Sequence, residues 1–520
     1  MLILDIHGEY ATALSDRATI FKINPDVTKA EKQLCVPFWA LNFDEFCDIA
    51  FGGIEGRGQS VVSDMILELK RAAINNFPKP GVSNDSVSAD TPVPFCVHKM
   101  WLDLHSREHL TVIPAPGGAT DEKVPAYVLN TAGQPIQIGD ALSVTPPQYR
   151  NVKTTGTATE RVQLGNEGVG IRQQLAGLAS KLRDPRFGFM FRPSGWLPQI
   201  NGQTQCDLED LLADWIGGVQ PVTILDLSGI PSSILNQLIG ALLRILYDAL
   251  FWGKNLPEGG RERPLLVVLE EAHNYLGKGD SNTASRTVRK IAKEGRKYGV
   301  GMMIVSQRPS EIDSTILSQC GTLFAMRLSN DLDRGQVKSI VSDNLTGLFE
   351  MLPVLRTGEA IIVGESVSLP VRTLIDPPAK NRRPDSIDPR VVARKGKDGD
   401  GLEAPGGWNQ QRDGQQSYAV EIEQWRRQSP RYEHGDINGQ GPIATLQAVA
   451  PDWTMTPESS TLSRIRYEAA SQVLTVDFRS AGIYEFYEVP ANLYQEMIES
   501  NLKGDFLSER IRGHFRYAKT

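Results

Sequence analysis

The chain has 520 residues, of which 40% are hydrophobic and 22% charged, and its formal net charge is −7. This length predicts two to four domains, and the acidic balance excludes nucleic-acid binding through bulk charge, so that any such surface must be local. The five cysteines form no C-x-x-C pair, which disfavours a zinc site or a disulfide framework and favours a reducing, cytoplasmic location. Because no apolar run reaches about 18 residues, a membrane partner is not expected.

The first third of the chain is predicted to be mainly helical. Residues 1–4 form an apolar run that predicts a buried strand, and we expect this strand to be an exposed edge of its sheet. Helices are predicted within residues 33–110, with 61–77 as the best amphipathic segment, and near 169–182. Residues 80–165, which are rich in Pro, Gly, Thr and Asn, predict an insertion of short strands and loops.

From residue 221 the pattern becomes regular, because strands alternate with helices. A turn followed by an apolar helix is predicted over residues 228–252, and a basic helix at about 283–298. The predicted strands are 222–227, 264–271, 300–307, 322–328 and 360–366. This alternation predicts an α/β fold with a doubly wound, mainly parallel sheet over residues 1–378, interrupted by an insertion at about 36–220.

The last part of the chain changes in composition twice. Residues 379–458 are polar and rich in Gly, Pro and Gln, which predicts a partly disordered linker. Residues 459–520 regain alternating apolar residues and predict a small α+β domain with antiparallel strands.

The stretch LLVVLEEAHNYL at 265–276 carries the clearest chemical signal. Its apolar run predicts a strand buried on both faces, and Glu270 and Glu271 follow at the carboxyl end, where open α/β sheets bind ligands. In P-loop NTPases such acids help to hold Mg²⁺ and orient the attacking water. We therefore predict that Glu270 assists Mg²⁺ and that Glu271 positions the water; the alternative is a charged pair that closes a strand. No G-x-x-x-x-G-K-[ST] motif occurs in the sequence.

Two other segments are predicted to border the same site. Gln307, at the end of the following strand, is a candidate sensor of the γ-phosphate, and Arg308 follows it where the chain turns. Asp5, His7 and Glu9 leave the first strand and are candidates to bind Mg²⁺ or its waters. The alternatives are an ordinary strand–turn and a polar loop.

A basic helix follows the paired acids. Six of the twelve residues from 286 to 297 are basic, and a solvated helix face is the ordinary explanation for such a run. The functional alternatives are an arginine finger, Arg296, and contacts with DNA phosphates. The candidates for the phosphate contacts are Lys278, Arg286, Arg289, Lys290 and Lys293.

With these motifs in place, residues 1–378 resemble HerA-type ATPases of the HerA/FtsK superfamily. The resemblance rests on DIHGEY, PFWALNFDEF, LRDPRFGF, VTILDLSGIP, LLVVLEEAH, KEGRKYGVGMMIVSQRPSEI and LRTGEAIIVGESVSLPVR, in this order. It implies a RecA-like P-loop NTPase core that uses ATP and Mg²⁺. Glu270 and Glu271 would be its Walker B acids, Gln307 its sensor, and Arg296 its arginine finger, acting on a neighbouring subunit.

The same resemblance implies partners and a process. Members of the family form hexameric rings that move double-stranded DNA, and they work with a nuclease or another defence effector in end processing or anti-phage defence. The family's phosphate-binding loop precedes DIHGEY and has no counterpart here, so we expect an incomplete N-terminal part. The alternative is a non-catalytic DNA-binding or ring-assembly subunit. A secretion or conjugation pump of the same superfamily is a third possibility.

Residues 459–520 resemble the KTSC domain, which occurs at the C-terminus of some lysyl-tRNA synthetases. The resemblance rests on SRIRYEAASQVLTVDF, GIYEFYEVP and GDFLSERIRGHFRY. It implies nucleic-acid binding, for which Arg512 and Arg516, interleaved with aromatic residues, are the candidates. The alternative is a solvated basic tail.

Overall fold

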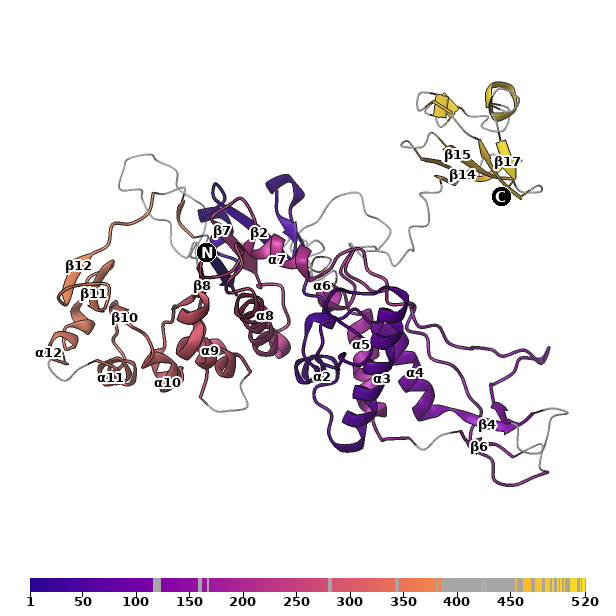
Figure 1. The fold of residues 1–520 in the computed structure, drawn as a ribbon, viewed down its shortest axis with the longest axis horizontal. Helices are drawn as coiled ribbons and strands as arrows, with labels where there is room; N and C mark the ends of the chain where they lie inside the picture. The colour runs from indigo at the N-terminus through magenta and orange to yellow at the C-terminus, as the bar shows by residue number, and fades with distance from the viewer. Residues whose placement is uncertain are drawn as a thin grey trace, which may run out of the picture. The chain divides into compact units, whose positions relative to one another are not determined.

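The computed structural model describes residues 1–115, 123–157, 161–165, 168–278, 283–341, 346–379 and 382–384, together with parts of 422–519. The chain divides into two compact units, Met1–Ile443 and Ala444–Thr520 (Figure 1). Each unit has a sheet and a hydrophobic core of its own.

The centre of the first unit is a six-stranded sheet in which every neighbouring pair is parallel. Its strand order is β3-β2-β7-β1-β8-β9. The strands are β1 (Leu2–Asp5), β2 (Ala18–Lys22), β3 (Lys32–Gln33), β7 (Val222–Asp226), β8 (Leu265–Leu269) and β9 (Val300–Ile304). Helix α8 (Ser232–Trp252) connects β7 to β8, and α9 (Thr283–Glu294) lies between β8 and β9 in the chain. The predicted α/β class with a mainly parallel sheet is confirmed.

The first strand lies in the middle of this sheet, so the prediction of an exposed edge at residues 1–4 was wrong. Ile3 is aligned with Ile224 of β7 on one side and with Val268 of β8 on the other. All four residues of β1 are buried. The pairing with β7 comes from a segment more than 200 residues away, and a local apolar pattern carries no information about such a partner.

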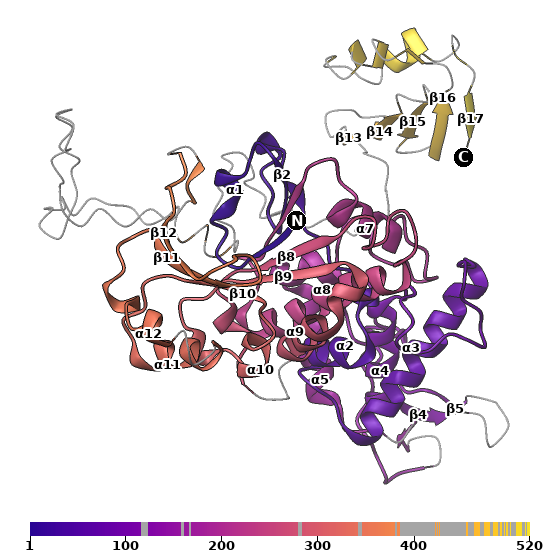
Figure 2. The same ribbon diagram turned by 60° about the vertical axis from the view of Figure 1, so that its left-hand side comes forward.

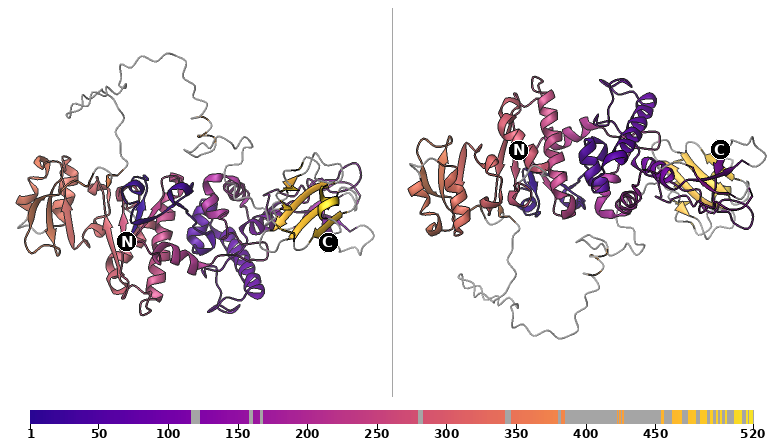
Figure 3. Two further views of the ribbon diagram at one scale, coloured as in Figure 1. Left: turned by 90° about the horizontal axis from the view of Figure 1, so that it is seen from above. Right: turned by 90° about the horizontal axis from the view of Figure 1, so that it is seen from below.

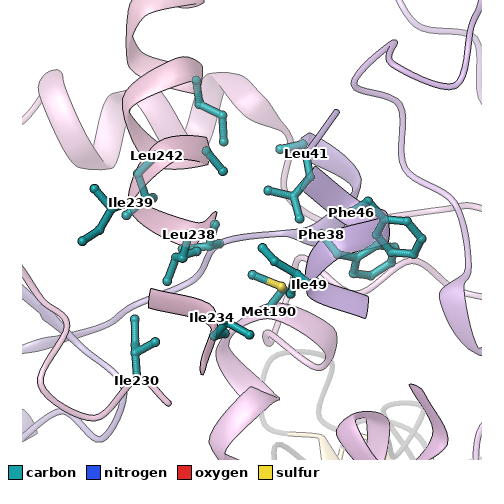
Figure 4. Close-up of a cluster of buried hydrophobic side chains, with 14 of the residues drawn as sticks. Phe38, Leu41, Phe46, Ile49, Met190, Ile230, Ile234, Leu238, Ile239 and Leu242 are labelled. Carbon is teal, nitrogen blue, oxygen red and sulfur yellow. The ribbon is translucent and has the colours of Figure 1, made fainter. Parts of the chain in front are cut away.

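Helix α8 forms much of the core beneath the sheet. Leu238 and Leu242 belong to a buried cluster that includes Phe38 and Phe46, on and next to α2 (Phe43–Phe51) (Figure 4). By length and composition α8 could cross a membrane, but 61% of its most apolar window is buried inside the fold. That burial is typical of the core helix of a globular domain.

The insertion between β3 and β7 carries the predicted helices. They are α2, α3 (Gly56–Asn76), α4 (Val97–His109) and α5 (Arg172–Arg183), and the insertion also contains α7 (Leu208–Ile216), which was not predicted. The short strands β4 (Thr111–Pro114), β5 (Lys123–Pro125) and β6 (Gln163–Leu164) form a small antiparallel sheet. Arg244 of α8 ties the insertion to the core, because its Nε donates to Glu45 Oε1 over 2.8 Å and its Nη2 donates to the Ala40 carbonyl over 2.9 Å.

The strands predicted at 322–328 and 360–366 exist, but they do not join the parallel sheet as expected. They are β10 (Thr322–Ala325) and β11 (Glu359–Gly364), which pair antiparallel, and β12 (Val371–Leu374) continues this second sheet. Their core is separate and includes Phe349, Leu352 and Ile361. Figures 1 and 3 show this sheet at one end of the unit, with the helices of the insertion at the other.

The second unit is a five-stranded antiparallel sheet. Its strands are β13 (Thr454–Met455), β14 (Leu462–Glu468), β15 (Val473–Phe478), β16 (Gly482–Phe486) and β17 (Tyr517–Lys519). The Tyr467 hydroxyl donates to the Val489 carbonyl over 2.6 Å. The predicted antiparallel strands are confirmed.

Candidate active site

The carboxyl ends of four neighbouring strands bring polar side chains to one edge of the central sheet. Asp226 ends β7 and Asp5 ends β1, while Glu271 follows β8 and Gln307 follows β9. Figure 2 shows β8 and β9 side by side. Because all of these strands are parallel, their carboxyl ends share one edge. The residues that the sequence singled out therefore lie along one edge of the sheet, and their roles stay predictions.

Glu271 is the most constrained of these residues. It is almost fully buried, and its backbone adopts the left-handed conformation, with φ 45° and ψ 45°. The amide Nε2 of Gln307 donates a hydrogen bond to Glu271 Oε1. The Ala272 N–H donates to the Val305 carbonyl over 2.9 Å and so fixes the turn against the end of β9. The predicted catalytic acid and the predicted sensor are therefore in direct contact.

His273 completes this arrangement, although no role was predicted for it from the sequence. Its Nδ1 lies 3.2 Å from Glu271 Oε2 and 3.2 Å from the Ser306 hydroxyl oxygen. Glu271 thus has Gln307 on one carboxylate oxygen and His273 on the other. The signal for His273 was its place two residues after Glu271, but only the tight turn that follows β8 brings its ring back to the carboxylate.

Glu270 points to different partners. It is half-buried, and its carboxylate accepts a hydrogen bond from the Tyr10 hydroxyl. Burial, and then the nearby charges of Glu271, Asp5 and Glu9, raise the pKa of Glu270, while the Tyr10 hydrogen bond opposes this shift. The accumulated negative charge favours a cation beside Glu270.

Asp5 shapes the loop that follows β1. Its carboxylate accepts backbone N–H groups from His7 at 3.2 Å, Gly8 at 2.8 Å and Tyr10 at 3.0 Å, and the side chain is fully buried. This loop presents His7 as an exposed residue and Glu9 as a half-buried one. The loop geometry explains Asp5 without a ligand, so its role in binding Mg²⁺ stays a prediction.

Asp226 and Lys22 form an ion pair at the same edge. This pair was not predicted from the sequence. Lys22 Nζ lies 2.7 Å from Asp226 Oδ2, and the carboxylate is fully buried. Asp226 Oδ1 also accepts the Ser228 hydroxyl over 2.6 Å. Asp226 ends a buried apolar strand just as Glu270 follows one, so the same pattern could have identified it.

The acidic edge offers few ligands for a metal ion. Within the described residues, no group of three or more His, Cys, Asp or Glu side chains is placed to hold a metal. Mg²⁺ often binds through one or two carboxylates together with waters and substrate phosphates. Glu270, which is half-buried among other acids, fits such a site better than Asp5.

Two predicted arginines lie apart from Glu271. Arg308 is exposed, and its Nη2 lies 2.8 Å from Glu311 Oε1. Arg296 is exposed in the 3₁₀ turn that precedes β9, whereas Gln307 follows the other end of that strand. Arg296 therefore does not join the site of its own chain, and its role as an arginine finger for a neighbour stays a prediction.

The basic helix is confirmed, but its cations are not equivalent. Lys278, Arg286, Lys290 and Lys293 are exposed. Arg289 is half-buried, and its Nη1 lies 3.8 Å from Asp313 Oδ2. Contact with DNA stays a prediction for this helix. Arg512 and Arg516 lie outside the described residues.

Three family models match the chain. The model described as "Helicase HerA, central domain" matches residues 1–246, and "Helicase HerA-like C-terminal" matches residues 198–384. The KTSC domain model matches residues 458–515.

Individual known proteins are similar to this chain over shorter stretches. The chain is 40% identical over 157 residues to a DNA double-strand break repair helicase HerA of Sulfurisphaera tokodaii, covering 30% of this chain and 31% of that protein. It is 42% identical over 107 residues to the HerA helicase of Pyrococcus furiosus, covering 21% and 19%. A lysine–tRNA ligase of Trichormus variabilis is 35% identical over 74 residues, covering 14% and 13%. The matches thus span about a third or less of these relatives' length.

Among solved structures, VirB4 of Thermoanaerobacter pseudethanolicus covers 74% of this chain and 83% of its own, at 12% identity and a TM-score of 0.40. The KTSC domain protein YPO2434 from Yersinia pestis covers 13% of this chain and 94% of its own, at 28% identity and a TM-score of 0.13. The two helicase models together span residues 1–384, and the chain therefore belongs to the HerA helicase family and carries a KTSC domain near its C-terminus.

Proposed function

We propose that this protein is part of an ATP-driven translocase or helicase that acts on double-stranded DNA in the cytoplasm. The observation that carries the proposal is the contact between Glu271 and Gln307 at the carboxyl ends of β8 and β9. A buried carboxylate can accept a proton from an attacking water, and an amide beside it can respond to a bound phosphate. The curated HerA relatives are named as double-strand break repair helicases.

The described residues suit distinct tasks in hydrolysis. Glu271 orients and deprotonates the attacking water. Glu270 assists Mg²⁺, which would neutralise charge that develops on the phosphates. Gln307 holds Glu271 in the observed position and exchanges that contact for one with the terminal phosphate.

A phosphate-binding loop is the missing part of this mechanism, and the outer edge of β9 is the place that we propose for it. Within the described residues, β9 is the last strand of its sheet. Met303 is 47% exposed there, although its apolar run predicts burial on both faces. A further parallel strand paired with β9 would end beside Gln307, and a loop that followed it would lie at the acidic edge.

The remaining parts of the proposal concern assembly. Arg296 lies at the opposite end of β9 from Gln307, so it can serve only a neighbouring subunit's nucleotide, as a hexameric ring would allow. Lys278 and the exposed cations of α9 contact DNA phosphates. A nuclease or another defence effector acts with the ring, in end processing or anti-phage defence.

The test is DNA-stimulated ATP hydrolysis by this protein together with the segment that supplies the phosphate-binding loop. E271Q keeps the size of the side chain but cannot accept a proton, so we expect hydrolysis to fall by about 10²- to 10⁴-fold. E68Q, at an exposed position of α3, is the matched control and should hydrolyse ATP at the wild-type rate. Wild-type turnover in E271Q would contradict the assignment.

The absence of a G-x-x-x-x-G-K-[ST] motif from the sequence favours a second candidate, a non-catalytic DNA-binding or ring-assembly subunit. That subunit would bind DNA yet show no ATP binding by itself. Equilibrium binding of a fluorescent ATP analogue to this protein together with the segment that supplies the phosphate-binding loop separates the two functions, because only the first requires saturable binding at Glu271, with a loss of affinity or hydrolysis when Glu271 is changed.

A further inference from the structure

An aromatic cluster lies at the C-terminal end of α8, at the opposite ends of the strands from the acidic residues. The rings of Tyr247 and Phe251 lie near the ring of Tyr298, with centroids 5.6 and 4.8 Å away, respectively. The ring of Trp252 meets Phe251 edge to face at 5.0 Å. We call these four residues the Trp252 platform. Three of its members are at least partly buried, but Trp252 is 82% exposed.

Two lysines lie over rings of the platform, and two more are their neighbours in the sequence. Lys290 Nζ lies 4.5 Å from the centroid of the Tyr247 ring, and Lys254 Nζ lies 5.9 Å from that of Tyr298. Lys293 is one helical turn beyond Lys290, Lys297 precedes Tyr298, and both are exposed.

The carboxylates nearest to the platform are already engaged. Glu294 Oε2 accepts the Tyr247 hydroxyl over 3.2 Å, and Asp248 Oδ2 lies 3.1 Å from Arg244 Nη1. The loop from Lys254 to Arg263 carries three cations against the two carboxylates of Glu258 and Glu262. The local balance is therefore positive, although the whole chain is acidic.

The platform is also firmly supported. Gly260 packs so closely against the backbone of Tyr298 and Gly299 that a side chain there would have no space. The Leu265 N–H donates to the Gly299 carbonyl over 2.8 Å and joins this turn to the start of β8. These contacts fix Tyr298, against which Phe251 packs, so the platform needs little further ordering on binding.

An exposed indole with lysines beside the neighbouring rings suits a particular ligand. The lysines attract a polyanion, and the free face of the indole can stack on a base. Bases inside a duplex are already stacked on one another, whereas unpaired bases are available. We propose that the Trp252 platform binds single-stranded nucleic acid, with a base on Trp252 and its phosphates on Lys254, Lys290, Lys293 and Lys297.

This site is separate from the acidic edge. Tyr298 precedes β9 and Trp252 precedes β8, so the platform lies at the amino ends of these strands, opposite Glu271. The inference rests on the proposed function in one respect: it adds a contact with single-stranded nucleic acid to a protein that acts on DNA. It would hold equally for the non-catalytic subunit.

The test is fluorescence anisotropy with a labelled oligothymidylate of about 20 nucleotides, measured without ATP. W252A should weaken binding by about 5- to 100-fold, while W252F, which keeps a π-face, should lose only a small part of that affinity. Binding to a labelled duplex of the same length should stay within about twofold. A uridylate oligomer of equal length shows whether RNA is bound as well as DNA.

The lysines give an independent readout. K290Q or K293Q should reduce the slope of log affinity against log salt by about 0.7 each, which is the value for one phosphate contact on a single strand. L256A, at a neighbouring exposed apolar position, is the control and should leave affinity unchanged.

Three results would overturn the proposal: no oligothymidylate binding by the wild-type protein, an unchanged affinity in W252A, or equal losses in W252A on single strand and duplex. A retained affinity of W252L for oligothymidylate, equal to that of W252F, would also overturn it. The contact at position 252 would then be apolar, as expected for a protein partner. Because the assay contains no ATP, it is unaffected by whether E271Q hydrolyses ATP.

Discussion

At the scale of single residues, the backbone of Glu271 is the strongest sign of function. A residue other than glycine in the left-handed region costs about 1–3 kcal/mol and persists where the surroundings enforce it. Here the hydrogen bonds of Ala272 and Gln307 enforce it. In this backbone conformation the Glu271 carboxylate lies towards the end of β9. A fully extended backbone would direct it elsewhere.

The sequence predicted part of this site. Apolar runs precede Glu270, Glu271 and Gln307, so the local sequence was sufficient to predict their place at the ends of buried strands. The contacts of His273 and Tyr10 could not, since they depend on how two turns fold back. Such turns are set by tertiary packing, which single-sequence patterns do not contain.

Lys70 is a second residue with an unusual environment. It is almost fully buried in the insertion, where Nζ donates to the Ala89 and Thr91 carbonyls over 2.6 Å each. Burial lowers the pKa of Lys70 to about 7, and the Asp90 charge opposes this shift only in part. An unfolded lysine keeps its proton up to about pH 10.4.

Lys70 should therefore make stability depend on pH. Between the two pKa values the unfolded state binds more protons, so the free energy of unfolding should rise as the pH increases from about 7 to about 10. Urea unfolding at both ends of this pH range should show a higher free energy of unfolding at the upper end in wild type. In K70M the contribution of Lys70 to this rise should be absent. K123M, at an exposed position, is the control; the same pH dependence in K70M and K123M would contradict the assignment.

At the scale of elements, the contact between α8 and α9 depends on a glycine. A Cβ on Gly240 would lie 2.8 Å from Thr283 Cγ2 and 3.0 Å from the Ala284 nitrogen. Helix propensity alone favours alanine over glycine inside a helix. The close approach of α9 outweighs that preference here, because neither backbone nor a buried threonine can move aside freely.

Gly240→Ala should therefore destabilise the protein by about 1–3 kcal/mol through overpacking. The matched control is Gly177→Ala in α5, where nothing lies within 4 Å of the added Cβ. That change should stabilise by about 0.5–1 kcal/mol, as helix propensity predicts. Denaturant unfolding measures both, and changes of the same sign would show that α8 and α9 do not approach this closely.

Predictions at this scale succeeded where periodicity was sufficient. The long helices and the strands β7, β8 and β9 were predicted from apolar patterns. The pairing of β10 with β11 was predicted wrongly, because a strand's pattern does not state its partner or direction. The short strand β2 was not predicted, although its Thr19, Ile20 and Phe21 are residue types that favour a strand.

At the scale of the whole molecule, two units with different sheets share one chain. The first unit contains the Glu271 site, and at the opposite ends of the same strands it contains the Trp252 platform. The family models confirm what the sequence resembled, a HerA helicase followed by a KTSC domain. The activity of the whole assembly remains the proposal, and it depends on hydrolysis at Glu271.

The most direct test of this account is the identity of the nucleotide that stays bound. This protein, together with the segment that supplies the phosphate-binding loop, is incubated with radiolabelled ATP, Mg²⁺ and duplex DNA. It is then separated rapidly from free nucleotide, and the bound fraction is resolved by chromatography. The account predicts ADP on the wild-type protein and intact ATP on E271Q, because binding persists while water activation is lost. ADP on E271Q in the wild-type proportion would contradict the central role given to Glu271.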